Sequence, residues 1–85
     1  MQITTIALDL VSHEHIGDAE DALTDAAIRA GVQDTLTIKA FIDIVADHLE
    51  TQHADSLLAR DLLDTLEAWE DDPEAALSDL SLVAS

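Results

Sequence analysis

The stretch Asp55–Asp71, D-S-L-L-A-R-D-L-L-D-T-L-E-A-W-E-D, decides the fold that this sequence predicts. On a helix, most of its apolar side chains share one broad face: Leu58, Ala59, Leu62, Leu66 and Trp69, with Leu63 at the edge. Asp64, Glu67 and Asp71 follow the opposite face at spacings i, i+3 and i+7. The segment therefore predicts a helix that buries leucines on one side and exposes carboxylates on the other.

Size and composition predict one small domain over residues 1–85. Leu, Ile, Val and Phe supply 25 side chains, enough for a helical core, while aromatic residues make up only 2%. Cysteine is absent, which argues against a disulfide framework or a thiolate metal site. No apolar run approaches the roughly 20 residues that span a membrane, and the N-terminus lacks the basic region of a signal peptide. We expect a cytoplasmic protein.

The net charge is the most unusual property of the chain. Nineteen acidic residues against three basic ones give a net charge of −16, and 13 of the acids are Asp. Such a chain repels nucleic acids and anionic membranes, so direct binding to either is not expected. It is attracted to basic protein surfaces, including those that normally hold nucleic acid. A general adaptation to high salt, as in halophile proteins, is the alternative explanation.

The N-terminal half predicts two elements separated by a connection. Residues 2–11 fit both a strand and a helix, because their apolar residues alternate but also recur at helical spacing, and a helix is slightly favoured. Residues 12–17 form a connection, and Asp18 is the expected N-cap of a helix with an alanine-rich face. Gly31 is expected to end that helix in the left-handed conformation. Asp25 and Arg29 are spaced for an ion pair.

The C-terminal half predicts the remaining helices. Apolar residues recur at helical spacing after a cap at Asp34, Thr35 or Thr37: Ile38, Phe41, Ile42, Val45 and Leu49. A bend is expected over 51–55, with Asp55 capping the next helix, although one continuous helix is an alternative. Asp72 and Pro73 predict the start of a last helix. The fold class is therefore all-α, a small bundle of four or five short helices whose short connections favour antiparallel neighbours.

Carboxylates at helical spacing are the first candidate for function. They form one stripe on each of three helices: Asp18, Asp21 and Asp25; Asp43, Asp47 and Glu50; Asp64, Glu67 and Asp71. Three or four helical residues advance about 4.5–6 Å, which is comparable to the spacing of phosphates along a nucleic-acid strand. In size and charge the chain resembles the DNA-mimic inhibitors that phages and mobile elements use against restriction and CRISPR effectors. That resemblance implies a non-catalytic inhibitor whose partner-binding residues come from these stripes: Asp21, Asp25, Asp43, Asp47, Glu50, Asp64, Glu67 and Asp71.

A second candidate is Ser56, in the triplet Asp55-Ser56-Leu57 at the start of the central helix. The triplet, with acids on the helix that follows, resembles the motif of acyl and peptidyl carrier proteins. The resemblance implies 4′-phosphopantetheine on Ser56 and docking of partner enzymes on Asp61, Asp64 and Glu67. The chain departs from the family pattern at His53, where the family has a small Gly, and only 29 residues follow Ser56.

Histidines and off-face aliphatic residues complete the candidates. His13 and His15 would converge on a metal only in an extended segment, and His48 and His53, five residues apart, are not expected to share a helix face. We therefore expect no metal site and no enzyme activity. Three aliphatic residues lie off the main apolar faces: Ile28, Ile44 and Leu57. They predict a second apolar surface and a weak homodimer favoured by salt.

Overall fold

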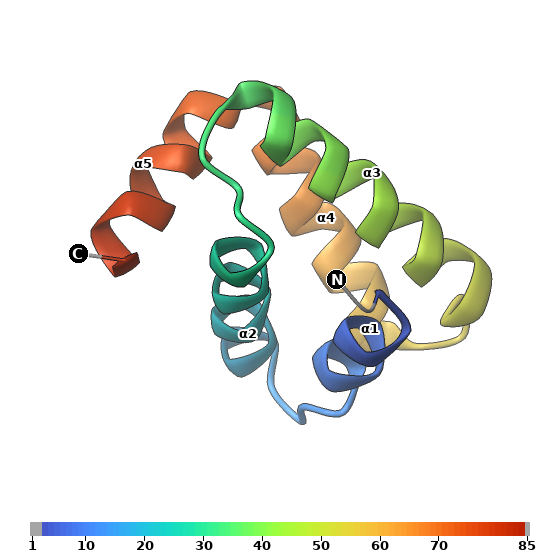
Figure 1. Cartoon of the computed structure of the whole chain (residues 1–85). Helices are drawn as coiled ribbons and strands as arrows, with labels where there is room; N and C mark the ends of the chain where they lie inside the picture. Colours follow the sequence, from blue (N-terminus) through green and yellow to red (C-terminus); the bar gives the residue numbers. More distant parts are fainter. Residues whose placement is uncertain (1–2, 85) are drawn as a thin grey trace.

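The N-terminal segment is a helix, the slightly favoured of the two alternatives. The computed structural model describes residues 3–84, with the backbone alone described for residues 82–84. Its elements are five helices: α1 (Ile3–Val11), α2 (Ile16–Arg29), α3 (Thr35–Gln52), α4 (Leu57–Asp71) and α5 (Pro73–Ala84). Over residues 3–84 there is no strand. The predicted all-α class is confirmed, and Figure 1 shows the five helices gathered into one compact globule.

Three of the expected helix ends are confirmed. Gly31 follows α2 with φ +87°, in the left-handed region that glycine tolerates at a helix C-terminus. Asp34 caps α3, since its Oδ1 accepts the backbone N–H of Thr37 at 2.8 Å. Asp72 precedes Pro73 at the start of α5, and its Oδ1 accepts the backbone N–H of Ala75 at 3.2 Å. A glycine after α2 and an aspartate before each of α3 and α5 therefore bound these helices as the sequence indicates.

Two expected N-caps were wrong. Helix α2 begins at Ile16, with His15 rather than Asp18 as its N-cap residue, and His15 makes no side-chain cap. The earlier start lets Ile16 pack against the core, and Asp18 then lies in the first turn, where the helix dipole favours a carboxylate. Helix α4 is capped by Ser56 rather than Asp55. The Ser56 hydroxyl accepts the backbone N–H of Ala59, which lies three residues on, at 3.2 Å.

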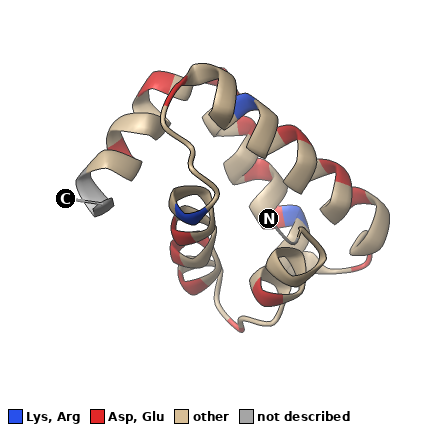
Figure 2. Ribbon diagram, viewed as in Figure 1, with Lys and Arg blue, Asp and Glu red and all other residues tan. Residues whose placement is uncertain are grey.

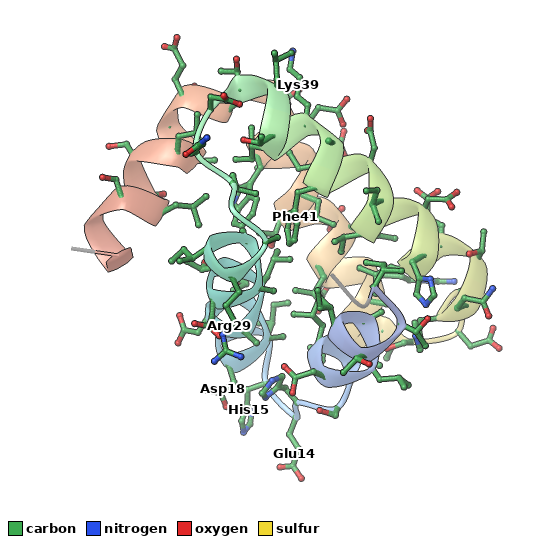
Figure 3. All side chains as sticks on the ribbon, viewed as in Figure 1. Glu14, His15, Asp18, Arg29, Lys39 and Phe41 are labelled. Atoms are coloured by element: carbon green, nitrogen blue, oxygen red, sulfur yellow. The ribbon has the colours of Figure 1, made fainter. Side chains whose placement is uncertain are left out.

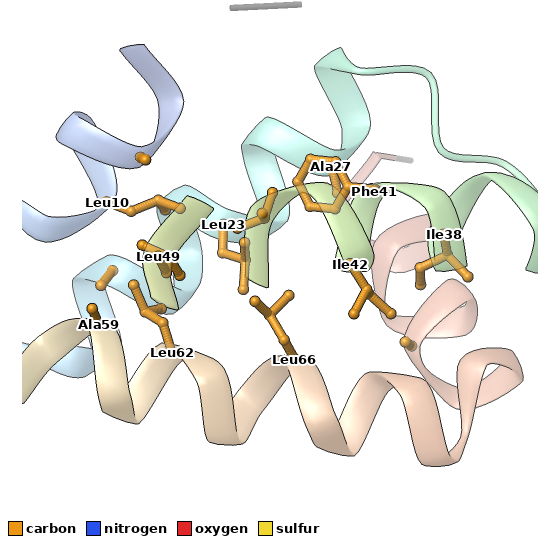
Figure 4. Packing of buried hydrophobic residues seen from close by; sticks show 14 of the residues in the cluster. Leu10, Leu23, Ala27, Ile38, Phe41, Ile42, Leu49, Ala59, Leu62 and Leu66 are labelled. Carbon is orange, nitrogen blue, oxygen red and sulfur yellow. The ribbon is translucent and has the colours of Figure 1, made fainter. Parts of the chain in front are cut away.

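The core is almost entirely aliphatic and lies between the helices, as Figure 4 shows for the packing of α3 against α4. Over residues 3–81, fifteen hydrophobic residues are buried: Ala7, Leu10, Ala19, Leu23, Ala27, Ile38, Phe41, Ile42, Val45, Leu49, Ala59, Leu62, Leu66, Ala76 and Leu80. The predicted apolar face of α3 is buried completely. On α4, the same face buries Ala59, Leu62 and Leu66, while Leu58 and Trp69 are half-buried against the core. Among residues 3–81 no polar or charged side chain is buried.

The order of the helices in space differs from a simple up-and-down bundle. Helices α3 and α4, joined by residues 53–56, lie side by side and form the most extensive contact (Figure 1). Helix α1 packs against α2 and α3, whereas α2 packs against α4 and α5 rather than against its successor α3. The short link over 30–34 runs from the end of α2 to the start of α3 without making the two helices packed neighbours (Figure 1). Short connections alone therefore did not determine which helices are adjacent.

The capping box at the start of α3 predicts a pH dependence of stability. The backbone N–H and the hydroxyl of Thr37 both bond the Asp34 carboxylate and hold its pKa below the ordinary value of 3.8. A lowered pKa adds stability above pH 3.8 and loses it as the pH falls through the folded-state pKa. Asp34→Asn keeps the capping acceptor without the titration. We expect the wild type to have a higher Tm than Asp34→Asn at pH 7. The difference between the two Tm values should disappear below pH 3.8. A gap that stays constant from pH 7 to pH 3 would contradict this.

Candidate acidic interface

All 19 acidic side chains are exposed. Figure 2 marks the acidic residues along the chain, most densely on α2, α3 and α4, with few basic residues between them. This distribution follows from the helical spacing, because each stripe lies on the side of its helix away from the core. What the spacing alone did not determine is which stripes lie next to each other.

Carboxylates from α3 and α4 meet around one shallow groove of about 310 Å³. We call it the α3–α4 groove. Its lining consists of four apolar and four acidic residues: Ile42, Ala46, Leu63, Leu66, Glu50, Asp64, Glu67 and Glu70. The groove therefore joins the α3 stripe, through Glu50, to the α4 stripe, through Asp64 and Glu67.

The positions of these side chains follow from the i, i+4 geometry of two packed helices. Ile42, Ala46 and Glu50 succeed each other at intervals of four, so they run along the flank of α3 that faces α4. On α4, Leu63 is followed at the same interval by Glu67, and Leu66 by Glu70. Each helix therefore presents an apolar side chain to the floor of the groove and a carboxylate one turn further along.

Few positive charges balance this surface. Within the part of the chain that the structure describes, the close pairs are Arg29 with Asp25, at 2.9 Å between Nε and Oδ2, and His13 with Asp9, at 3.8 Å, which is an ion pair only when the imidazole is protonated. Lys39 and Arg60 are exposed and belong to neither pair. Figure 3 shows Lys39 pointing outward at the start of α3. All four carboxylates of the α3–α4 groove are therefore outside these ion pairs.

The predicted partner-binding residues divide into three sets. Glu50, Asp64 and Glu67 line the α3–α4 groove. Asp43, Asp47 and Asp71 are exposed on the same two helices but do not line it. Asp21 and Asp25 belong to α2, and Asp25 is held by Arg29. The eight predicted residues therefore do not share one site.

Glu70 is the residue that sequence reasoning missed. The predicted stripe of Asp64, Glu67 and Asp71 does not include it. The signal that identifies it is its position four residues after Leu66, which places it beside the buried face rather than opposite to it.

Asp25 lines a separate groove between α1 and α2, with a volume of about 610 Å³. Its lining is mixed: Thr5, Ile6, Asp9, Ala22, Asp25, Ala26, Arg29 and Ala30. Ala22 and Ala26 of α2 and Ala30, which follows the helix, lie four residues apart, so their methyl groups line the groove beside Asp25 and Arg29. This groove is larger than the α3–α4 groove, but Arg29 neutralises one of its two carboxylates.

Two of the histidines lie close together. His48 and His53 lie with ring centroids 5.9 Å apart, although five residues on a helix would separate them. They approach each other without sharing a helix face, because α3 ends at Gln52 and His53 has a non-helical backbone that turns it back toward His48. Within the described residues, no three His, Asp or Glu side chains form a group that could hold a metal ion.

Ser56 lies at the N-cap of α4, half-buried, where its hydroxyl accepts a hydrogen bond from Ala59. Asp61, Asp64 and Glu67, the acids that the carrier-protein resemblance implies for docking, are exposed on the helix that follows.

The three off-face aliphatic residues do not form one surface. Ile28 is half-buried and packs against the core, so its expected exposure was wrong. Leu77 and Leu80 of α5 lie beside Ile28, because α5 crosses over α2 there. Ile44 of α3 and Leu57 of α4 stay exposed, at 44% and 76% of their surfaces. Two of the three residues expected to form the homodimer interface are therefore exposed, and the weak homodimer stays a prediction.

The chain was compared with protein families, curated proteins and solved structures. No protein family, curated protein or solved structure matches the chain. Among the helices that the structure describes, none is long and apolar enough to cross a membrane.

Proposed function

We propose that this protein is a non-catalytic acidic interaction module that engages or blocks a basic protein surface, one that normally binds nucleic acid, by charge mimicry. The α3–α4 groove is the proposed contact. The observation that carries the proposal is the meeting of four exposed carboxylates from two helices around one groove, with no ion pair among the described residues to neutralise them. In this proposal the protein acts in the cytoplasm, on an effector of the restriction or CRISPR kind.

The physical basis is the exchange of counterions. A basic groove that binds nucleic acid gathers anions, and a fixed array of carboxylates releases them as phosphates do. Holding carboxylates on rigid helices avoids much of the ordering cost that a flexible acidic tail would incur on binding. The net charge of −16 also attracts a basic partner from a distance and repels nucleic acid itself.

The proposal predicts that this binding depends on salt. We expect complexes captured on the tagged protein at 50 mM salt to be released at high salt, and duplex DNA or RNA to compete with them. Glu50→Gln with Glu67→Gln removes one carboxylate from each wall of the groove. If each carboxylate substitutes for one phosphate contact, this variant should reduce the slope of log affinity against log salt by about 2.

Asp18→Asn with Glu20→Gln is the matched control, since it removes the same charge from α2, away from the α3–α4 groove. We expect the control to retain nearly the wild-type slope. Binding that is independent of salt, or lost equally in both variants, would contradict the proposed contact. Melting curves of each variant establish that the fold is intact.

A carrier function is the alternative, favoured by the place of Ser56 at the start of an acid-bearing helix. It requires a phosphopantetheinyl transferase to join one 4′-phosphopantetheine to the Ser56 hydroxyl, with coenzyme A as donor. Under the proposal made here, the intact mass should stay unchanged after incubation with a broad-specificity transferase. A gain of one phosphopantetheine that is lost in Ser56→Ala would replace charge mimicry with the carrier function.

A further inference from the structure

The floor of the α3–α4 groove has a different chemistry from its walls. Ile42 and Leu66 are buried beneath it, and Ala46 and Leu63 are half-buried at its surface. A nucleic-acid groove presents polar base edges at this position, whereas here the partner meets only aliphatic groups. A partner that balanced the carboxylates alone would leave this apolar floor in contact with water. A partner that also inserts an aliphatic side chain would remove the apolar floor from contact with water.

The carboxylates of α4 that line the groove are spaced to match basic residues on a helix. Along α4, Asp64, Glu67 and Glu70 succeed each other every three residues, or about 4.5 Å. A partner helix with Lys or Arg at intervals of three or four residues matches this spacing.

We propose that the occupant of the α3–α4 groove is one amphipathic basic helix of the partner, with an aliphatic ridge on the groove floor and Lys or Arg over the walls. This inference rests on the function proposed above and names the element that is recognised. Charge complementarity selects this occupant, because the lining carries four carboxylates and no basic side chain. A second copy of this chain would instead bring a further charge of −16 to the same place.

The arrangement of the walls also orients the helix. Three of the four carboxylates come from α4 and one from α3. The denser row of basic residues should therefore lie over α4, with the aliphatic ridge directed between Ala46 and Leu63. A groove of about 310 Å³ accommodates side chains from one face of a helix and not the helix itself. The partner helix should therefore lie on the groove with its far side exposed.

Two synthetic peptides of identical Leu and Lys composition test this inference. One places Leu at helical i, i+3 and i+4 spacing, and the other is scrambled so that Leu is spread around the helix. We expect the amphipathic peptide to bind at least 10-fold more tightly than the scrambled one and to gain helical circular dichroism on binding. The affinity of each peptide should fall as the salt concentration rises, and that of the amphipathic peptide should fall less steeply.

A pair of protein variants locates the binding site. Ala46→Leu fills the groove floor without a change of charge, and Ala40→Leu adds the same group at an exposed position of the same helix. We expect Ala46→Leu to weaken binding of the amphipathic peptide about 10-fold and to leave binding of the scrambled peptide unchanged. Ala40→Leu should change the affinity for neither peptide. Equal affinities for the two peptides would overturn the inference of a helix and leave charge mimicry intact. Equal effects of Ala46→Leu and Ala40→Leu on the amphipathic peptide would do the same. Failure of both peptides to bind at low salt would overturn the proposed function as well.

Discussion

Leu62→Ala is expected to lower the free energy of unfolding by about 2–5 kcal/mol. Leu62 lies at the middle of α4 and is completely buried in the core shared with α3. Removal of its terminal carbons loses their transfer free energy and leaves a cavity that neighbouring helices fill only in part. Small domains have about 5–15 kcal/mol of stability in total. This single change should therefore remove a large fraction of the stability of this protein.

Leu57→Ala provides the matched control on the same helix. Leu57 is 76% exposed, so we expect its replacement to change the free energy of unfolding by no more than about 0.5 kcal/mol. Urea unfolding followed by circular dichroism measures both variants against wild type. If Leu57→Ala destabilised as much as Leu62→Ala, then Leu57 would be buried in solution, as in the predicted homodimer. A concentration dependence of that loss would identify the dimer.

The contrast between Leu62 and Leu57 shows which parts of the fold were predictable. Both are leucines of one helix, and the 3.6-residue period separates them correctly into a buried and an exposed position. The same period predicted the buried face of α3, from Ile38 to Leu49. Local chemistry also located Gly31, Asp34 and Asp72 at helix ends. These features depend on neighbours within about four residues, which the sequence displays directly.

Features that depend on tertiary packing were predicted less well. The start of α2 moved to Ile16 because burial of that side chain outweighs the better cap at Asp18. Ile28 was expected to be exposed but is covered by α5, a segment about 50 residues away in the sequence. His48 and His53 approach each other only because α3 ends between them. In each case the deciding contact or chain break could not be read from a helical repeat.

The candidate site shows the same division. Spacing predicted that Glu50, Asp64 and Glu67 point outward, and all three are exposed. It did not predict that α3 and α4 bring them to one groove while Asp25 lines another with α1. That distinction comes from the order of the helices in space, in which α2 packs on α4 and not on α3. A per-helix pattern contains no information about this order.

Raising the salt concentration is expected to stabilise the folded protein by about 2–4 kcal/mol. Acidic residues at i, i+3 or i, i+4 occur in two pairs on α2, two on α3 and four on α4. Each such pair costs about 0.2–0.5 kcal/mol at low salt. Between 10 mM and 1 M KCl the Debye length falls from about 30 Å to about 3 Å, so these repulsions are largely screened. For a domain of this size, we expect a rise of about 10 °C or more in Tm.

Glu67 and Asp79 separate screening of specific pairs from a general effect of salt. Glu67 has acidic neighbours at Asp64, Glu70 and Asp71, whereas Asp79 has none at these spacings on α5. Glu67→Gln should raise the low-salt Tm by about 4–8 °C, since it relieves about 1 kcal/mol of repulsion. It should also flatten the salt dependence. Asp79→Asn removes the same charge, but it should raise the low-salt Tm less and should flatten the salt dependence of Tm less. A Tm that is constant below about 0.3 M KCl would show that the stripes do not repel appreciably.

Stability and binding should therefore respond to salt in opposite directions. Screening strengthens the fold because it weakens repulsion within the stripes, and it weakens the proposed complex because it weakens attraction to a basic partner. If the acidity serves only as an adaptation to high salt, then stability should rise with salt without any partner that salt releases. If it serves recognition, release of the partner should occur at salt concentrations where the protein is at its most stable. Measuring Tm and affinity on the same salt series excludes unfolding as the cause of release.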